Sequence, residues 1–564
     1  MYQSGTTASS DSSLDLLAKI VQLATSQHVD TANPAATGSG YAVGDMLEYT
    51  TGTGATLFTA TFEVVAINGS NQPTALRIVN GGAFSDRVAT AAINTAGSGY
   101  PASSTAYVRL TGDDATEQGT ATQQCKLSVT VNGSGVPTAV SIIEGGGAYT
   151  VAPSPLTGVK TATIGPDGVT GSGLTVDITM VSLPSLTGVS LTTLTGSGTG
   201  ATATLTLAAT GQSCNEDDVV SGSLTKGRDR HDFSDAFGKD DHKEVVLTGT
   251  VAGGDEPITG YRTYNDEVGA TTYTGIMLCA MDTHNPALEL TANLNFGPIA
   301  SGPSNNGGSY LPLANEAAPF WLSVTGRRVG PLIVKTQRAL TTSYVHAYDG
   351  LLAPIGPVTE KPLPMYVAGS CASTENNPDD GGPLVSGLTE AFRSTALSSG
   401  PCYYRRVSDA SYQTCANGQG TVMGALTILQ QRTIYPIGRV LNVTSGDNFI
   451  VNDGNFTFYD GTMAADGGPA SQVFVPTVGA SGEKVQLIRA QLNLAVAVEG
   501  AEDEPYGELE NVYWVPKRAP GGGDVAAEDT ITNGLAGAAK RVWRVFPNAD
   551  RSDEYSFMAI EEGV

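Results

Sequence analysis

Apolar and polar residues alternate along many short stretches of this chain, which is the pattern of half-buried β-strands. The clearest such stretch is at 320–325, and a turn at 326–328 separates it from a returning strand at 332–334. Proline lacks a backbone N–H, so the four prolines between 354 and 364 favour a loop laid over a sheet. The clearest alternation spans 320–325, and its inward-facing residues would be Phe320, Leu322 and Val324.

The clearest helix signal lies near the N-terminus. Ser12 and Ser13 can cap a helix that begins at Leu14. A helix of this length is marginal in water by itself, so its apolar stripe must be buried. Its own body domain and a neighbouring subunit are both open as burial sites, and we expect the helix to help join neighbouring subunits. The stripe follows the spacing i, i+3, i+4 and i+7, and consists of Leu17, Ile20, Val21 and Ala24.

Residues 34–155 contain an internal repeat. Each copy starts with Gly-Ser-Gly-Tyr, at 38–41 and at 97–100, and ends with glycines, an alanine and an aromatic residue. Both copies place two strands around an Asn-Gly turn, at Asn68 and at Asn132. Glycine allows the positive φ angles of sharp turns, and the final aromatic can plug the end of a small barrel or sandwich. The sequence therefore predicts two similar β modules with one strand order.

The predicted fold class is mainly β and multidomain, with small repeated β modules in an N-terminal arm, a larger β-sandwich-like body and one N-terminal helix. The chain of 564 residues is long enough for several domains. The predicted divisions are an N-terminal helix and linker at 1–33, a first β repeat at 34–90, a second β repeat at 91–155, a third β segment and linker at 156–212, and a main β-rich body domain at 213–564 with a lateral elaboration at about 383–480.

Composition supports short strands and disfavours several classes of function. Only 15% of the residues are charged and 69 are glycine, which argues against both a disordered polyelectrolyte and a helical protein. The net charge of −25 disfavours nucleic-acid binding, which depends on Lys and Arg. We find no secretory signal and no apolar run long enough to cross a bilayer, so we expect synthesis in the cytoplasm and no membrane span.

The densest cluster of charged residues lies between Arg228 and Glu244. Histidine and aspartate side chains together are typical of metal sites, but an exposed loop is the favoured interpretation. We therefore expect no metal, no cofactor and no catalytic residue, and we predict that the protein is not an enzyme. The weak metal candidates in this cluster are His231, Asp232, Asp235 and His242.

Three further chemical signals are weaker. Residues 452–455 and Asp460 offer oxygen ligands for calcium without a complete calcium-loop spacing, so turns are favoured. Residues 196–200 resemble a phosphate loop but lack its Gly-Lys-Ser/Thr ending. None of the six cysteines forms a Cys-x-x-Cys pair, so we expect buried free thiols, while a bridge between Cys402 and Cys415 remains open.

Short runs in the second part of the chain resemble a family of tailed-bacteriophage virion structural proteins. The resemblance covers the N-terminal helix and everything after Cys214, and it rests on the order and spacing of the runs. The glycine-tyrosine β repeats are similar to those of phage tail and fibre proteins. The family supplies no functional residues for transfer. The runs are Gly260–Thr263, Arg327–Val329, Tyr348–Leu352, Lys361–Pro364 with Gly369 and Ser370, and Val542–Asn548.

The resemblance implies a structural component of a tailed-phage virion, in the tail, baseplate or fibre-attachment region, that acts through homo-oligomeric assembly. Its partners would be copies of itself and other virion proteins, and it would be assembled into the virion in the host cytoplasm. The alternatives are an adhesin or fibre protein that binds a host-surface glycan, a neck or collar protein, and a capsid decoration protein. A virion-borne glycan depolymerase is a further alternative, which would need two carboxylates about 5–10 Å apart in a groove.

Overall fold

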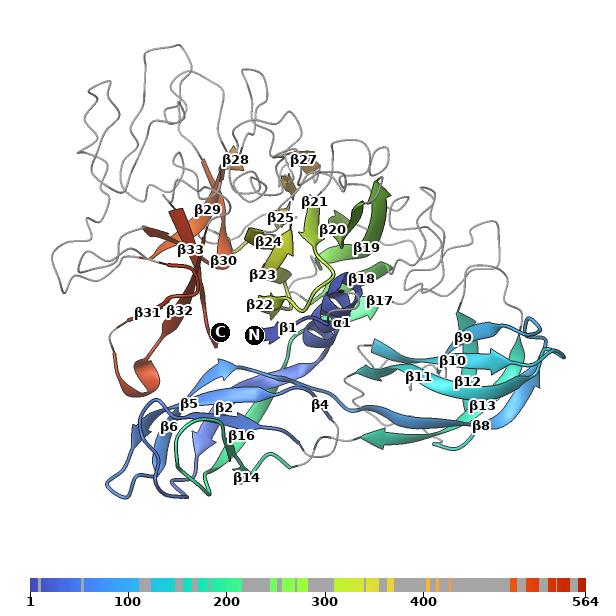
Figure 1. Cartoon of the computed structure of the whole chain (residues 1–564), viewed down its shortest axis with the longest axis horizontal. Helices are drawn as coiled ribbons and strands as arrows, with labels where there is room; N and C mark the ends of the chain where they lie inside the picture. Colours follow the sequence, from blue (N-terminus) through green and yellow to red (C-terminus); the bar gives the residue numbers. More distant parts are fainter. Residues whose placement is uncertain are drawn as a thin grey trace, which may run out of the picture.

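The computed structural model of the chain contains a body and an arm of two smaller modules (Figure 1), and its fold is mainly β with one α-helix. No helix in the described part of the chain is long and apolar enough to cross a membrane. The residues that the structure describes are 1–8, 12–51, 55–110, 123–147, 156–164, 171–181, 183, 185–215, 244–250, 256–268, 271–281, 309–338, 341–354, 363–369, 402–405, 412–414, 426–427, 487–494, 504–516, 526–533, 535–547 and 556–563.

Two antiparallel sheets face each other across the main core of the body. Phe320, Leu322 and Val324 point into this core, so the orientation predicted for 320–325 is confirmed. The first sheet has seven strands, in the order β1 (Tyr2–Thr6), β22 (Pro319–Thr325), β23 (Arg328–Arg338), β24 (Thr341–Leu351), β25 (Met365–Ala368), β26 (Cys402–Arg405) and β27 (Tyr412–Thr414). The second has five, in the order β17 (Gln212–Asn215), β18 (Glu244–Gly249), β19 (Ile258–Val268), β20 (Thr271–Met281) and β21 (Ser309–Leu313).

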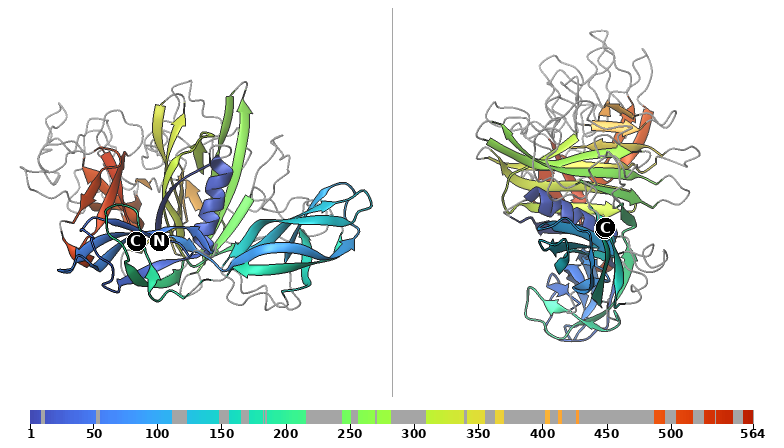
Figure 2. Two further views of the ribbon diagram at one scale, coloured as in Figure 1. Left: turned by 60° about the horizontal axis from the view of Figure 1, so that its bottom comes forward. Right: turned by 90° about the vertical axis from the view of Figure 1, so that its right-hand side faces the viewer.

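Helix α1 (Ser12–Thr25) lies inside the same body (Figures 1 and 2). It contacts strands of both sheets, and its apolar stripe belongs to their shared core. Leu17, Ile20, Val21 and Ala24 are all buried there. The prediction that this stripe joins neighbouring subunits is therefore wrong, because strands of the same chain already cover it. The helix itself is confirmed, but it begins at Ser12, so Ser12 and Ser13 are its first residues. Their hydroxyls hydrogen-bond to the Ala314 carbonyl oxygen and to the Thr274 hydroxyl, so the prediction that they cap a helix beginning at Leu14 is wrong.

A third sheet packs on the other face of the seven-stranded sheet, which makes the body three layers deep. The rings of Trp321 and Phe546 meet across this boundary with centroids 4.8 Å apart. Tyr344 also reaches Phe546, at 6.0 Å between centroids. This C-terminal sheet has the order β28 (Leu426–Thr427), β29 (Ile488–Leu494), β30 (Glu504–Pro516), β33 (Ser556–Glu561), β32 (Val542–Pro547) and β31 (Thr530–Thr532), with the short helix η4 (Gly537–Ala539) between β31 and β32.

The arm consists of two modules, each with its own core. Module 1 has a four-stranded sheet, β15 (Thr192–Thr193), β3 (Met46–Tyr49), β5 (Ala60–Ile67) and β6 (Pro73–Asn80), and a five-stranded sheet, β14 (Val189–Ser190), β16 (Thr202–Ala209), β2 (Gln27–Pro34), β7 (Ala83–Phe84) and β4 (Thr56–Phe58). Module 2 has one six-stranded sheet, β11 (Pro137–Gly147), β10 (Gln123–Val131), β9 (Thr105–Leu110), β12 (Val159–Ile164), β13 (Ser172–Val181) and β8 (Arg87–Ser98).

Each strand of module 2 has a counterpart in module 1. The order β11-β10-β9-β12 corresponds to β6-β5-β3-β15, and β13-β8 corresponds to β16-β2. In both modules the two ends of the series contact each other, β8 with β11 and β2 with β6. The two repeats therefore share one strand order and one way of closing on themselves.

The modules are inserted one inside the other. The first and last strands of module 1 are neighbours, with Gln27 opposite Ala209. The first and last strands of module 2 are also neighbours, with Arg87 opposite Val181. Module 2 leaves module 1 after β7 and returns before β14, whereas module 1 leaves the body after α1 and returns before β17. Each insertion therefore starts and ends at nearly the same point of its host (Figure 1).

The divisions predicted from the sequence are continuous stretches of chain, whereas the structural units are built from separate stretches. Segment 156–212 is not a unit of its own, because β12 and β13 complete module 2 and β14–β16 complete module 1. Segment 1–33 is also divided, since β1 and α1 belong to the body and β2 to module 1. Hydrophobic periodicity gives the face that a strand buries, not its neighbour in the sheet. Most of the lateral elaboration predicted at 383–480 lies outside the described residues.

Candidate functional site

The centre of the body is organised around Arg328, at the start of β23. Its guanidinium is buried, and the whole residue is 3% exposed. It donates hydrogen bonds to the Ser323 carbonyl oxygen at 3.3 Å and to the Gly330 carbonyl oxygen. Its Nε donates to the Glu510 carboxylate at 3.1 Å. A buried charge needs such a set of partners, because an unpaired one would be very costly.

Glu510 joins the C-terminal sheet to the seven-stranded sheet of the body. Besides Arg328, it lies 3.6 Å from the guanidinium of Arg327, which also donates to the Leu352 carbonyl oxygen at 3.1 Å. Beside it, the backbones of Ala353 and Glu508 exchange two hydrogen bonds of 2.8 Å. Two arginines from one hairpin therefore hold one carboxylate of β30, and a short backbone bridge sets its register.

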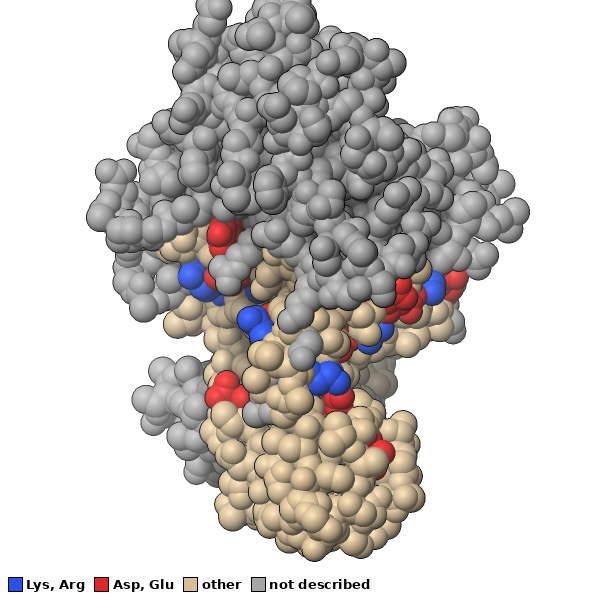
Figure 3. All heavy atoms as spheres, turned by 90° about the vertical axis from the view of Figure 1, so that its left-hand side faces the viewer, with Lys and Arg blue, Asp and Glu red and all other residues tan. Residues whose placement is uncertain are grey.

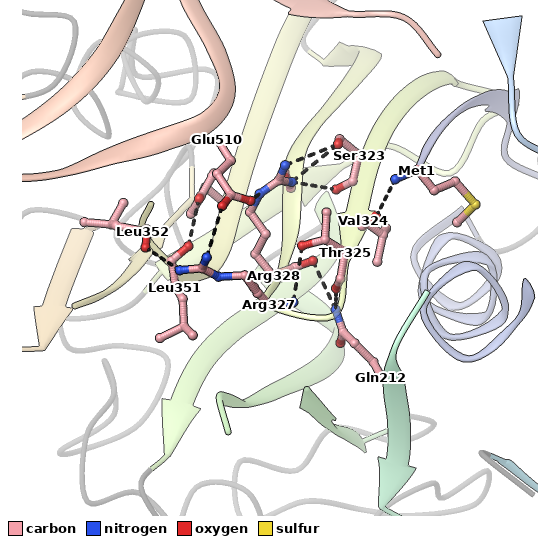
Figure 4. A network of polar contacts seen from close by, with 12 residues as sticks. Met1, Gln212, Ser323, Val324, Thr325, Arg327, Arg328, Leu351, Leu352 and Glu510 are labelled. Atoms are coloured by element: carbon pink, nitrogen blue, oxygen red, sulfur yellow. Dashed lines mark hydrogen bonds and ion pairs between the residues drawn. The ribbon is translucent and has the colours of Figure 1, made fainter. Parts of the chain in front are cut away.

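Two further segments of the chain contact this junction (Figure 4). The Gln212 side-chain amide, where module 1 returns to the body, donates to the Thr325 carbonyl oxygen at 2.6 Å and to that of Arg328 at 3.0 Å. The amino group of Met1 donates to the Val324 carbonyl oxygen at 2.9 Å. Burial, together with Arg328, lowers the pKa of this amino group to about 5. The arm, the central hairpin and the C-terminal sheet are thus all fastened at one place.

Gly350 makes room for the junction. Its φ is +139°, and a Cβ there would lie 2.5 Å from the Arg328 Cα. No other amino acid fits such a backbone position without displacing the arginine. The sequence run Tyr348–Leu352 therefore contains a residue with a steric role.

A second buried polar group lies between the two facing sheets. Asp349 on β24 is opposite Tyr261 on β19, and both residues are buried. Burial raises the pKa of Asp349 well above its ordinary value, while the Tyr261 hydroxyl acts in the opposite direction. Burial, followed by the charge of Asp349, raises the pKa of Tyr261. The carboxyl is therefore neutral over a wider pH range than an exposed aspartate.

The other face of β24 also carries a buried titratable group. His346 and Tyr348 point away from Asp349, toward the C-terminal sheet, and the Tyr348 hydroxyl donates to the Leu351 carbonyl oxygen at 3.1 Å. Burial lowers the pKa of His346 well below its ordinary value, so this imidazole is neutral at physiological pH. One strand thus places an acid and a base in the two boundaries between the three layers.

A row of ion pairs, which we call the charged seam, joins module 1 to the C-terminal sheet. Glu63 on β5 accepts a hydrogen bond from Arg77 Nε at 2.9 Å and another from Lys540. Arg77 lies 3.7 Å from Glu562, which Arg544 contacts at 2.6 Å. Figure 3 shows basic and acidic side chains along the boundary above a lower lobe, module 1, that carries few charges. The seam fixes module 1 to the body.

Module 1 also covers the open edge of β1. The Ser4 N–H and hydroxyl donate to the Asn80 side-chain oxygen at 2.9 and 3.1 Å, and the Gly81 N–H donates to the Tyr2 carbonyl oxygen at 3.1 Å. Uncovered strand edges invite pairing with other chains. The arm therefore closes one edge of the seven-stranded sheet.

A tyrosine–glycine contact closes each module. The ring of Tyr41 packs on Gly198, and the ring of Tyr100 packs on Gly171. A Cβ added to either glycine would lie 2.2 or 2.4 Å from the ring. The Tyr41 hydroxyl accepts a hydrogen bond from the Ala201 N–H at 3.1 Å. Sequence analysis missed this contact, although Gly-Ser-Gly at 171–173 and Gly-Thr-Gly at 198–200 form a second repeated pair that could have shown it.

The structure places the predicted chemical sites as follows. The glycine run 196–200 packs against the first repeat, where Ser39 and Thr199 form a β-bridge. The weak metal candidates His231, Asp232, Asp235 and His242, the calcium candidates at 452–455 and 460, and Cys415 lie outside the described residues. Among the residues that are described, no group of histidine, cysteine, aspartate and glutamate could hold a metal ion. Cys125 and Cys279 are buried and form no disulfide bond.

The described runs that resemble the virion family meet in the body. Arg328, Asp349 and Tyr261 come from three of these runs, and Phe546 from a fourth. Their contacts link the sheets of the body to one another, as described above. No family model matches this sequence, and no curated protein matches it either. The family assignment therefore stays a prediction that rests on these residues.

Proposed function

We propose that this protein is a structural component of a tailed-phage virion, in the tail, baseplate or fibre-attachment region, and that it acts as a homo-oligomer. The observation that supports this most is the way the polar chemistry of the described body is used. The buried Arg328, its half-buried partner Glu510 and the ion pairs of the charged seam connect layers and modules to one another. Such a framework holds a projecting arm in a fixed position, which is what an assembly subunit requires.

The architecture of the arm supports the same proposal. Two closed β modules in series extend the molecule away from the body (Figure 2). Each is attached at neighbouring strand ends, so a module can be added to such a scaffold without disturbing its host. In this proposal the body mediates assembly, and the arm projects from the surface of the particle.

The glycan-binding alternative has less support from the described arm. A glycan site commonly uses exposed aromatic rings as a stacking platform. The tyrosine and phenylalanine rings that we can place in the modules are largely internal. The buried ones are Tyr41, Tyr49, Phe62, Phe84 and Tyr100.

The test is to determine the copy number and symmetry of this chain in intact particles by cryo-electron microscopy. We expect a threefold or sixfold ring on the tail, with the arm projecting outward. Hundreds of copies on the shell would refute the tail location and favour a capsid decoration protein. Failure to find the chain in purified particles, checked by mass spectrometry, would refute the virion proposal altogether.

A further inference from the structure

Asp349 is a carboxyl group enclosed in the core of the sandwich. It shares its face of β24 with Val345 and Ala347, which belong to the apolar core between the two facing sheets. The residue is 1% exposed. An ionised carboxylate in such surroundings is unfavourable unless opposite charges or several hydrogen bonds compensate for the lost hydration.

The groups around Asp349 offer little compensation. On the neighbouring strands, Val329 of β23 and Val367 of β25 stand opposite it. Across the core, Tyr261 interacts with it electrostatically, but neither the Asp349 carboxyl oxygens nor the Tyr261 hydroxyl has a hydrogen-bond partner among the described residues. Cys279 of β20 is the other titratable group that acts on Tyr261. Among the described residues that influence Asp349, none is a cation.

We propose that the Asp349–Tyr261 pair is a pH-sensitive contact between the two facing sheets of the body. The sandwich is closed while the Asp349 carboxyl is neutral, and it is weakened when that carboxyl ionises. Helix α1 and the strands that hold the Arg328 junction share this core, so weakening it loosens the framework that supports the arm. This inference concerns the body alone and does not depend on the proposed function.

The direction of the pH effect follows from the environment of the group. Burial raises the pKa of Asp349 in the folded protein, whereas in the unfolded chain it ionises near its ordinary value. Between these two pKa values unfolding releases one proton, so the unfolding equilibrium constant rises about tenfold for each pH unit. The stabilising contribution is complete below the unfolded pKa and is lost as the pH rises through the folded one. The contribution of His346 has the opposite sign, because its pKa is lowered and its stability is lost as the pH falls.

The test compares the full chain with the variant Asp349→Asn, which keeps the shape of the side chain and cannot ionise. Denaturant unfolding is measured from about pH 5 to pH 9 for both proteins. We expect the ratio of the two unfolding constants, wild type over variant, to rise with pH by up to about tenfold per unit. The control is Glu256→Gln, at an exposed position just before β19, which should leave the pH dependence of the wild type unchanged.

A second measurement detects the neutral acid directly. The infrared difference spectrum between wild type and Asp349→Asn at neutral pH should contain the carbonyl stretch of one protonated carboxylic acid. Parallel pH profiles, or the absence of this band, would overturn the proposal. Should the Asn variant not fold, Asp349→Leu provides the same two comparisons with an apolar side chain in an apolar core.

Discussion

Modules 1 and 2 have the same strand order and the same tyrosine–glycine closure, yet they are attached to the rest of the molecule in different ways. Module 1 is held by the charged seam and also covers the edge of β1. Module 2 is joined to module 1 by two chain connections, one beside Asp86 and one beside Leu183, and the Leu183 backbone N–H donates to the Asp86 carboxylate at 2.5 Å. Its strand β10 also contacts β17 of the body, but no ion pair of the charged seam involves module 2. The fold of a module is therefore independent of how firmly the module is held.

The residues that make the difference can be located by comparing the two copies. Glu63 pairs with Met46, the first residue of β3, and with Arg77 on β6. In module 2 the residue opposite Thr105, the first residue of β9, is Thr130, and its partner on β11 is Ala139. A charged cross-strand pair in module 1 thus corresponds to an uncharged pair in module 2. The core and the turns are therefore shared by both modules, whereas the charged seam involves module 1.

The largest expected difference between the modules comes from removing the closing tyrosines. Tyr41→Ala and Tyr100→Ala each remove a buried ring, at a cost of about 3–5 kcal/mol. We expect Tyr41→Ala to lower the unfolding midpoint of the whole body, because module 1 is coupled to it through the seam. We expect Tyr100→Ala to unfold module 2 alone, with loss of hydrogen-exchange protection confined to β8–β13.

The two variants serve as controls for each other, since the same side chain is removed from the same place in two copies of one fold. Equal losses of body stability in both would show that the arm and body unfold as one cooperative unit. In that case module 1 and module 2 would be coupled to the body to the same extent.

A smaller effect is expected from the seam. Burial disfavours ionisation of Glu63, but the hydrogen bonds from Lys540 and Arg77 outweigh it and lower the pKa of Glu63. Its contribution to stability is therefore present above the ordinary glutamate pKa and is lost as the pH falls through the lowered one. Glu63→Gln should cost about 1–3 kcal/mol, because it leaves two cations without their carboxylate.

Calorimetry at neutral and acidic pH measures this effect, and small-angle scattering should show module 1 moving away from the body in the variant. The control is Glu48→Gln on β3, a half-buried glutamate with no ion pair to the C-terminal sheet among those of the described residues. A Glu63→Gln protein with wild-type stability at neutral pH would mean that the seam does not fasten the arm.

The sequence predicted those features that local pattern determines. Helix α1, the inward-facing side of 320–325 and the two Asn-Gly turns follow from periodicity and turn chemistry, and these agree with the structure. In each turn, the Asn68 or Asn132 side chain accepts the N–H of the residue two positions later at 2.9 Å. These interactions lie within a few residues of one another, so the sequence contains the information directly.

Features that depend on distant segments were not predictable in the same way. The seam joins Glu63 to Lys540, and the central junction joins Arg328 to Glu510. Asp349 was part of a run that resembled a family, but nothing around it in the sequence indicates burial opposite Tyr261. The nested insertion was also missed, because the strands that close each module come from opposite ends of its sequence.

The smallest expected effect concerns the chain connection between the two modules. The Asp86 carboxylate accepts the Leu183 N–H, where the chain returns from module 2 to module 1. Asp86→Ala removes a hydrogen bond to a charged group, worth about 1.5–3 kcal/mol at most, and the half-exposed position of Asp86 brings this toward the lower end. Both modules keep their own cores, so neither should unfold. The expected result is a broader distribution of distances between spin labels on the two modules, with only a small decrease in the unfolding midpoint. Asp177→Ala is the matched control, since Asp177 accepts the Gly158 N–H at 2.9 Å within module 2. That variant should leave the distance distribution unchanged, because no chain connection between modules is involved. If Asp86→Ala leaves the distribution as narrow as in the wild type, the position of module 2 is set by its other contacts, and the two modules are held alike.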